Sequence, residues 1–190
     1  ERSKSKFVRQ GMNSSMIKLW GECKYVYNPA SAKLDPEPIS SQPALSAVLD
    51  FVNSTEGTSF NSILVNYYRG HEVSLARHKD NEPNLVPTAP IATFSIGAVR
   101  FMKFSRSKSS PVHDYEQRLS SNSLFVMEAA TQRDYFHEIA KGSSPEEMGS
   151  RFSVTFRVMK TSRGATHHSD ISRSTTATTL VTDKIRPANS

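Results

Sequence analysis

The chain has 190 residues, 36% of them hydrophobic, and its 24 Lys and Arg against 18 Asp and Glu give a formal charge of +6. This length fits one domain better than two. No stretch approaches the roughly 18 consecutive apolar residues that cross a bilayer, and the basic start is not followed by a signal-peptide apolar run. Cys23 is the sole cysteine, which excludes an internal disulfide and a zinc site of several thiolates. We therefore expect one folded unit in a reducing, intracellular compartment, the cytoplasm rather than the nucleus.

The excess of positive charge favours a polyanionic partner such as nucleic acid without identifying it. Several of the cations lie in segments 1–9 and 160–173, where a solvated tail explains them equally well. Because the chain starts at Glu1 without a methionine, we expect it to be cut from a longer protein. The expected organisation is a flexible basic segment at 1–15, a folded domain at 16–160 and a disordered Ser- and Thr-rich tail at 161–190.

The folded part begins with one helix and continues as strands. Segment 43–51 (PALSAVLDF) is bounded by polar and turn residues and places Leu45, Val48, Leu49 and Val52 on one helical face. Short β-branched and aromatic runs follow, and they predict strands at 62–68, 89–96, 99–105, 122–129 and 151–159. Regularly spaced short strands are typical of a sandwich or a barrel. In the last run apolar residues alternate with polar ones, which predicts one face on a core and the other on a cavity.

Three residues could bind a metal ion. His78 and Asp80 are two residues apart, so in an extended strand their side chains point to the same side. His137 follows the strand-like run 123–132 in a polar and aromatic setting that suits a neutral imidazole ligand. Two histidines and one carboxylate leave open the positions that non-haem iron(II) uses. An H-x-D triplet alone is more often a surface feature, and His113 is a rival third ligand, although the Ser- and Lys-rich loop ending at Pro111 is a poor platform for it.

Four segments occur in the order found in one protein family, preceded by the shorter LWGECKYVY at 19–27: FNSILVNYYRG at 60–70, RHKDNE at 77–82, NSLFVMEAATQRDYFHEIAKG at 122–142 and RFSVTFR at 151–157. They resemble the motifs of AlkB-type nucleic-acid dealkylases, which depend on iron(II) and 2-oxoglutarate, from about Leu19 through Arg157. The resemblance implies a mainly β fold with flanking helices, the double-stranded β-helix or jelly roll. It implies the same three iron ligands, His78, Asp80 and His137, and O2 as the second co-substrate.

The resemblance also implies a 2-oxoglutarate site. Arg151 would hold the distal carboxylate, Arg157 would lie near the C1 carboxylate, and Asn66 and Tyr68 would donate further hydrogen bonds. Arginine suits this role because its guanidinium offers two parallel charge-assisted hydrogen bonds. Strand alternation places the two arginines on one face, where both can point into one pocket. Without the motif, two solvated arginines on an edge strand would be the simpler interpretation.

Substrate contacts follow from the resemblance less directly. Glu82 would lie near the damaged base, where its carboxylate could accept a hydrogen bond from an exocyclic amino group. Tyr25, Tyr27 and Trp20 could stack on an extruded base, although aromatic residues in a strand pattern more often belong to a core. The implied activity is oxidative demethylation of N-alkylated bases of the 1-methyladenine and 3-methylcytosine type in single-stranded RNA or DNA, with 2-oxoglutarate converted to succinate.

Two alternatives stay open at this point. One is a related oxygenase acting on a protein or a lipid, and the other is a non-catalytic RNA-binding module that keeps the fold. The segments GECKYVY, HKDNE and EAATQRDYFH are similar to AlkB domains of plant RNA-virus replication polyproteins, which favours RNA. One spacing departs from the bacterial prototype, because the stretch from Asn66 to His78 is one residue longer. A bulge or a longer turn around Gly70 is therefore expected.

Overall fold

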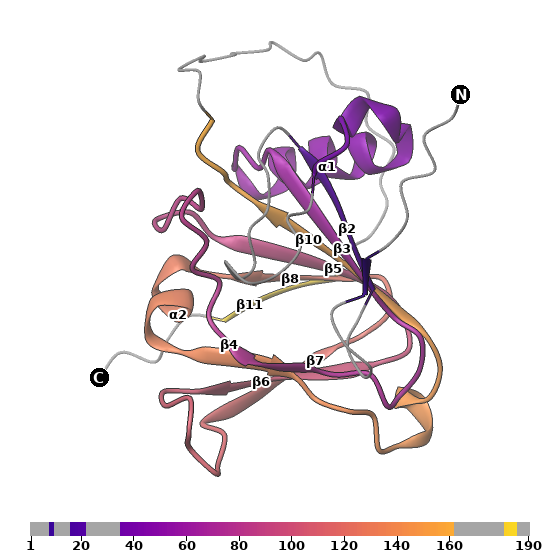
Figure 1. The fold of residues 1–190 in the computed structure, drawn as a ribbon, viewed down its shortest axis with the longest axis vertical. Coiled ribbons are helices and arrows are strands. Elements are labelled where there is room, and N and C mark those ends of the chain that lie inside the picture. Colours follow the sequence, from indigo (N-terminus) through magenta and orange to yellow (C-terminus); the bar gives the residue numbers. More distant parts are fainter. Residues whose placement is uncertain (1–7, 10–15, 22–34, 162–180, 186–190) are drawn as a thin grey trace.

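The computed structural model describes residues 8–9, 16–21, 35–161 and 181–185. In this part of the chain two β-sheets face each other and a helix lies over the outer surface of the larger sheet (Figure 1). The larger sheet has seven strands in the order β1 (Val8–Arg9), β2 (Met16–Gly21), β3 (Ser62–Tyr68), β10 (Arg151–Arg157), β5 (Ile91–Gly97), β8 (Ser123–Met127) and β11 (Val181–Ile185). The smaller sheet has four strands in the order β4 (Leu75–His78), β9 (Phe136–Ile139), β6 (Arg100–Ser105) and β7 (Tyr115–Leu119). The predicted mainly β, jelly-roll fold is confirmed.

Two hydrophobic clusters hold these layers together. The cluster between the sheets takes residues from both of them, including Tyr68 and Phe125 from the larger sheet and Phe104 and Leu119 from the smaller one. The second cluster joins the outer face of the larger sheet to α1 (Pro43–Glu56). Large aromatic and aliphatic side chains buried in this way are the main stabilising contribution to a fold of this size.

The helix matches the prediction and continues beyond it. Pro43 occupies the first turn, where its missing N–H has no helical partner to lose, and Gly57 ends the helix in the left-handed conformation at φ 63°. Leu49 and Val52 are buried against the sheet, and Leu45 and Val48 pack beside them. The predicted apolar face is therefore the face that covers the outer surface of the larger sheet.

Strand β10 also has the predicted two faces. Val154 and Phe156 belong to the cluster under α1, whereas Ser153, Thr155 and Arg157 line a cavity on the other side. The strand pairs antiparallel with β3 on one edge and β5 on the other, so both faces are fixed by regular register. An alternating strand in the middle of a sheet cannot slip by one residue without exchanging its faces.

Other elements differ from the predictions. Residues 129–132, predicted to extend a strand, belong to α2 (Ala129–Asp134), because the chain leaves β8 in the larger sheet and crosses to β9 in the smaller one. Strands β1 and β11 lie within the segments expected to be flexible or disordered, and they pair with β2 and β8. Their pairing uses backbone groups that sheet edges expose, which side-chain patterns do not reveal. The domain boundaries themselves stay a prediction.

The longer spacing before His78 is taken up in two places. A turn is closed by the hydrogen bond from the Val73 amide to the Gly70 carbonyl at 3.2 Å, and the register of β4 against β9 is irregular between Leu75 and His78. Short 3-10 helices, η1 (Ile39–Ser41) and η2 (Pro145–Glu147), complete the described elements. Among the described helices, none is long and apolar enough to span a bilayer.

Candidate metal centre

The three predicted metal ligands meet at the end of the smaller sheet. His78 ends β4 and lies directly opposite His137 on β9, with 4.3 Å between the ring centroids. Asp80 follows two residues later, and one ligand atom from each of the three side chains lies within 4.8 Å of the others. Asp80 and His137 are buried, and the side chain of His78 is 16% exposed. The structure therefore brings together the three residues that the sequence predicted as ligands.

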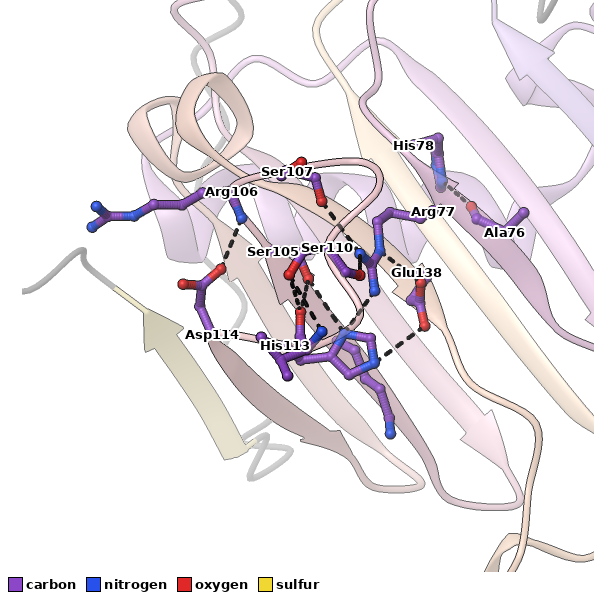
Figure 2. Close-up of polar contacts among 12 residues, drawn as sticks. Ala76, Arg77, His78, Ser105, Arg106, Ser107, Ser110, His113, Asp114 and Glu138 are labelled. Atoms are coloured by element: carbon purple, nitrogen blue, oxygen red, sulfur yellow. Dashed lines mark hydrogen bonds and ion pairs between the residues drawn. The ribbon is translucent and has the colours of Figure 1, made fainter.

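The imidazole of His78 is oriented by the backbone. Its Nδ1 lies 2.8 Å from the carbonyl oxygen of Ala76 (Figure 2). A carbonyl only accepts, so Nδ1 carries the proton and Nε2 faces Asp80 Oδ1 at 3.5 Å. Burial works to lower the pKa of His78, but the hydrogen bond and the charge of Asp80 raise it above 6.5. A histidine whose second nitrogen is held by a backbone carbonyl is the usual form of a metal ligand.

His137 is kept neutral. Burial lowers the pKa of its imidazole to about 3, and the nearby His78 adds to this effect. Its buried Nδ1 has no hydrogen-bond partner among the described residues. A buried polar atom without a partner is rare in folded proteins, because leaving its hydrogen bond unmade costs about 1–3 kcal/mol. A neutral imidazole with an unused nitrogen fits a metal ligand.

Asp80 is held in its charged form by its neighbours. Burial alone would raise the pKa of the carboxyl, but the guanidinium of Arg157 and the two histidines lower it well below its ordinary range. Arg157 Nη2 donates to Asp80 Oδ2 at 2.9 Å, and the side-chain amide of Gln132 donates to the Asp80 backbone carbonyl. Together the two imidazoles and the carboxylate form a donor set that suits a divalent ion with open coordination positions.

A cavity extends from these ligands between the two sheets, and we call it the metal cavity. Its wall includes Asn66, Tyr68 and Arg157, which are three of the four residues predicted to bind 2-oxoglutarate. The full lining is Ile17, Leu64, Asn66, Tyr68, Leu75, His78, Asp80, Ile91, Thr93, Met102, Phe125, Met127, His137, Ile139, Ser153, Thr155 and Arg157. About half of these side chains are apolar, and the polar ones come from β3, β10 and β5 of the larger sheet and from the metal ligands at the end of the smaller one.

Arg151, the fourth predicted residue, does not line the metal cavity but lies next to it, opposite Tyr68 in the β3–β10 register. Its side chain is fully buried, and Nη2 donates to Ser95 Oγ at 2.9 Å. Burial lowers the pKa of the guanidinium to about 10, with Tyr68 opposing this shift and the nearby Arg100 adding to it. In the described part of the chain no carboxylate pairs with Arg151, and its Nε has no hydrogen-bond partner. A buried cation without a counterion suits an anionic ligand.

Several polar residues of this region were not predicted from the sequence. Thr93 and Ser95 occupy alternate positions of β5 and face inward, and their alternation with Ala92 and Phe94 was a usable signal. Gln132 had no such signal, because it lies on the short helix α2 and acts through the backbone of Asp80. His113, the rival ligand, lies outside the centre and contacts Arg77 and Glu138.

The residues predicted to contact the substrate lie in different parts of the chain and of the fold. Glu82 lines a second cavity of about 780 Å³, which shares Asp80 with the metal cavity and which we call the adjoining cavity. The buried Oε2 of Glu82 has no hydrogen-bond partner among the residues that the structure describes. Trp20 packs in the core beneath α1, so the core interpretation of this residue is the correct one. Tyr25 and Tyr27 lie outside the described residues.

Comparisons with known proteins identify the family. The model of the 2OG-Fe(II) oxygenase superfamily matches residues 2–157. "Alpha-ketoglutarate-dependent dioxygenase alkB homolog 3" of Bos taurus is 35% identical over 149 residues, which is 74% of this chain and 50% of that protein. "DNA oxidative demethylase ALKBH2" of Homo sapiens is 28% identical over 144 residues, which is 73% of this chain and 54% of that protein.

The likeness extends to three dimensions. The structure of OsALKBH1 superposes with a TM-score of 0.51 at 17% identity and covers 75% of this chain and 77% of that one, which supports the shared fold. The chain spans about half the length of the curated relatives that it matches. The family model covers most of the chain and includes all three candidate ligands. The chain therefore belongs to the 2OG-Fe(II) oxygenase superfamily, as a member of its AlkB type.

Proposed function

We propose that the chain is a dioxygenase that removes N-linked methyl groups from bases of single-stranded nucleic acid, with iron(II), 2-oxoglutarate and O2. The observation that carries this proposal is the cluster of His78, Asp80 and His137 at one cavity. Close to this cavity lies the buried guanidinium of Arg151, which pairs with no carboxylate in the described part of the chain. A metal site alone would fit many activities. A metal site combined with a buried cation fits an acidic co-substrate that reaches from one to the other.

Each residue of the site has a proposed task. His78, Asp80 and His137 hold iron(II), and Arg151 binds the distal carboxylate of 2-oxoglutarate. Arg157 holds Asp80 through its 2.9 Å hydrogen bond and also lies within reach of the cavity. When bound, iron(II) supplies the chemistry by which O2 oxidises 2-oxoglutarate to succinate and CO2 and hydroxylates a substrate C–H bond.

Two further wall residues would complete the co-substrate site. Asn66 and Tyr68 are buried on β3, and they belong to the metal cavity together with Ser153 and Thr155 of β10. These neighbouring strands present amide and hydroxyl groups that can hydrogen-bond the carboxylates and the keto oxygen of 2-oxoglutarate. The apolar remainder of the wall excludes water from the reacting atoms, which strengthens every polar contact inside.

The adjoining cavity favours nucleic acid as the substrate class. It shares Asp80 with the metal cavity, and its wall carries the cationic residues Lys79, Arg133 and Lys160. Glu82 adds a buried carboxylate oxygen with no partner among the described residues, which could accept a hydrogen bond from the exocyclic amino group of a base. Cations suit a phosphate backbone, whereas an uncharged lipid or a neutral peptide would not use them. An unpaired strand is the expected form, since its bases leave the stack at the lowest cost.

The test is product release from methylated oligonucleotides. Wild-type protein with iron(II) and 2-oxoglutarate is mixed with single-stranded RNA, or with single-stranded DNA, that contains 1-methyladenine or 3-methylcytosine. We expect succinate and formaldehyde in equal amounts, because hydroxylation of an N-methyl carbon releases one formaldehyde for each 2-oxoglutarate consumed. His137→Ala should release neither product. The RNA and DNA arms report which strand is preferred.

The outcomes separate the alternatives. If the wild type converts 2-oxoglutarate to succinate but releases no formaldehyde from any of these oligonucleotides, the dioxygenase site stands and nucleic acid is not its substrate. If the wild type binds the oligonucleotides and makes no succinate under any condition, the chain is a non-catalytic binding module and the proposed enzyme activity is wrong. If His137→Ala keeps full activity, the proposed ligand set is wrong.

A further inference from the structure

A cluster of charged residues lies on the face of the smaller sheet opposite the metal centre. Arg77 precedes His78 in β4, and Glu138 follows His137 in β9. Neighbouring residues of a strand point to opposite faces, so the pair that flanks the ligands points away from the metal. Arg77 Nε donates to Glu138 Oε2 at 2.9 Å, and the two side chains are only 12% and 23% exposed. Figure 2 shows both side chains turned toward each other and toward His113.

Arg77 uses its whole guanidinium in this cluster. Besides Glu138, its Nη1 donates to the carbonyl oxygens of Ser107 at 3.2 Å and Ser110 at 2.6 Å, and its Nη2 lies 2.9 Å from His113 Nδ1. A guanidinium only donates, so Nδ1 of His113 accepts this hydrogen bond, and the ring N–H of His113 is at Nε2. That nitrogen faces Glu138 Oε1 at 3.6 Å. The contacts form a closed triangle of side chains, and they tie β4 to the loop between β6 and β7.

The cluster lies where the backbone alone holds the ligands least firmly. Strand β4 has four residues, is the edge strand of its sheet, and its register against β9 is irregular between Leu75 and His78. Arg77 falls inside this irregular stretch. An edge strand has a single neighbour to fix it, and a break in the ladder re-aims the side chains beside it. The ion pair from Arg77 to Glu138 bridges the two strands at this point.

We propose that Arg77, Glu138 and His113 form a positioning cluster that fixes β4 against β9 and thereby sets the separation of His78 and His137. The inference rests on the metal ligands assigned under the proposed function. None of the three residues touches the metal, and each acts through the strand or loop that carries it. A metal site loses affinity when its supporting residues let the ligands drift by fractions of an ångström.

The test measures metal affinity and not turnover. Mn²⁺ serves as a redox-inert probe, and its dissociation constant is measured by calorimetric titration of the 190-residue chain at a temperature where every variant is folded. Arg77→Lys keeps the charge but loses the multiple directed contacts, and Glu138→Gln keeps the shape but loses the charge. Each should weaken Mn²⁺ binding by about 3–10-fold, less than the 10–100-fold typical of a direct hydrogen-bond partner of a ligand. The double variant should bind Mn²⁺ with about the same affinity as the single variant that binds it less tightly, since both changes break one cluster.

A matched control comes from the same sheet. Arg118 of β7 forms an exposed ion pair with Glu146, and Glu146→Gln removes this charge without changing a contact of Arg77, Glu138 or His113. This control should bind Mn²⁺ within about twofold of the wild type, as expected for an exposed pair of small energetic weight. The paramagnetic resonance spectrum of bound Mn²⁺ gives a second readout, and it should change in the Arg77 and Glu138 variants and not in the control.

Two outcomes overturn the inference. If Arg77→Lys and Glu138→Gln bind Mn²⁺ as tightly as Glu146→Gln with an unchanged spectrum, the cluster supports only the fold, even where the unfolding temperature falls. Glu138→Gln decides the question alone if Arg77→Lys does not fold. If His137→Ala binds Mn²⁺ as tightly as the wild type, the ligand assignment itself fails, and the positioning cluster fails with it.

Discussion

The site has a metal end, formed by His78, Asp80, His137 and Arg157, and an arginine end, formed by Arg151 and Arg100. The two ends balance charge in different ways. At the metal end, the Asp80 carboxylate has Arg157 at 2.9 Å and His78 at 3.5 Å. At the arginine end, the buried guanidiniums of Arg151 and Arg100 influence each other, and among the described residues no carboxylate pairs with Arg151. The carboxylate of the metal end is therefore paired within the protein itself, whereas Arg151 at the arginine end has no carboxylate partner among the described residues.

This difference indicates how binding energy is distributed. An ion pair buried between protein groups holds the geometry in place, so the metal ligands are arranged before a metal arrives. An unpaired buried cation is a cost that the fold bears until a ligand removes it. An anionic co-substrate that reaches Arg151 gains the energy of a charge-assisted hydrogen bond in a site with little water. Co-substrate affinity should accordingly depend on the arginine end, and stability of the free protein on the metal end.

The largest effect is expected from breaking the ion pair at the metal end. Arg157→Met leaves the buried Asp80 carboxylate without its cation, so the free energy of unfolding should fall by about 3–5 kcal/mol. Urea denaturation at pH 7 in the presence of a chelator measures this loss. The double variant Asp80→Leu with Arg157→Met should recover part of it, because both charges are then absent. A loss below about 1 kcal/mol in the single variant would contradict the picture of a charge-balanced metal end.

The next effect should appear at the arginine end and in a different measurement. Arg151→Met removes a buried cation that pairs with no carboxylate among the described residues, so the unfolding free energy of the free protein should change by less than about 1 kcal/mol. Affinity for 2-oxoglutarate, titrated in the presence of Mn²⁺, should fall by about 10–100-fold, as for the loss of a charged hydrogen bond. Arg118→Met is the control, because Arg118 is 47% exposed on β7 and pairs with Glu146. Arg118→Met should leave the affinity unchanged.

Much of this arrangement could be predicted from the sequence. The apolar face of α1 and the alternation of β10 follow from local periodicity, and the structure has both. The ligands His78 and Asp80 were predictable because a spacing of two residues in extended chain fixes their direction. His137 was identified from its setting and its motif. The structure places it opposite His78 through the pairing of β4 with β9, which a single sequence does not display.

The remaining features depend on contacts between distant segments. Strand β7 (YEQRL) was missed because only Tyr115 and Leu119 are apolar, and its place is set by pairing with β6. The closeness of Arg100 and Arg151 arises from strands in different sheets. The cluster of Arg77, Glu138 and His113 likewise joins three separate segments. Local periodicity carries information about the faces of one element, and contacts of this kind need the topology of the whole sheet.

The smallest effect concerns the loop that supports the arginine end. At the start of η2, Ser144 Oγ donates to Glu147 Oε1 at 2.6 Å, and the Glu147 carbonyl accepts a hydrogen bond from Arg100. The Ser144 hydrogen bond lowers the pKa of Glu147 below 4.5, so its stabilisation is present above pH 4.5 and is lost as the pH falls through the lowered value. Ser144→Ala should cost about 1 kcal/mol at pH 7 in urea denaturation, and the difference from wild type should shrink below pH 4.5. Ser143→Ala, at the exposed neighbouring position, should leave the free energy of unfolding unchanged both at pH 7 and below pH 4.5. A deficit of Ser144→Ala that is equal at both pH values would mean that the Glu147 charge does not contribute to holding this end of the site.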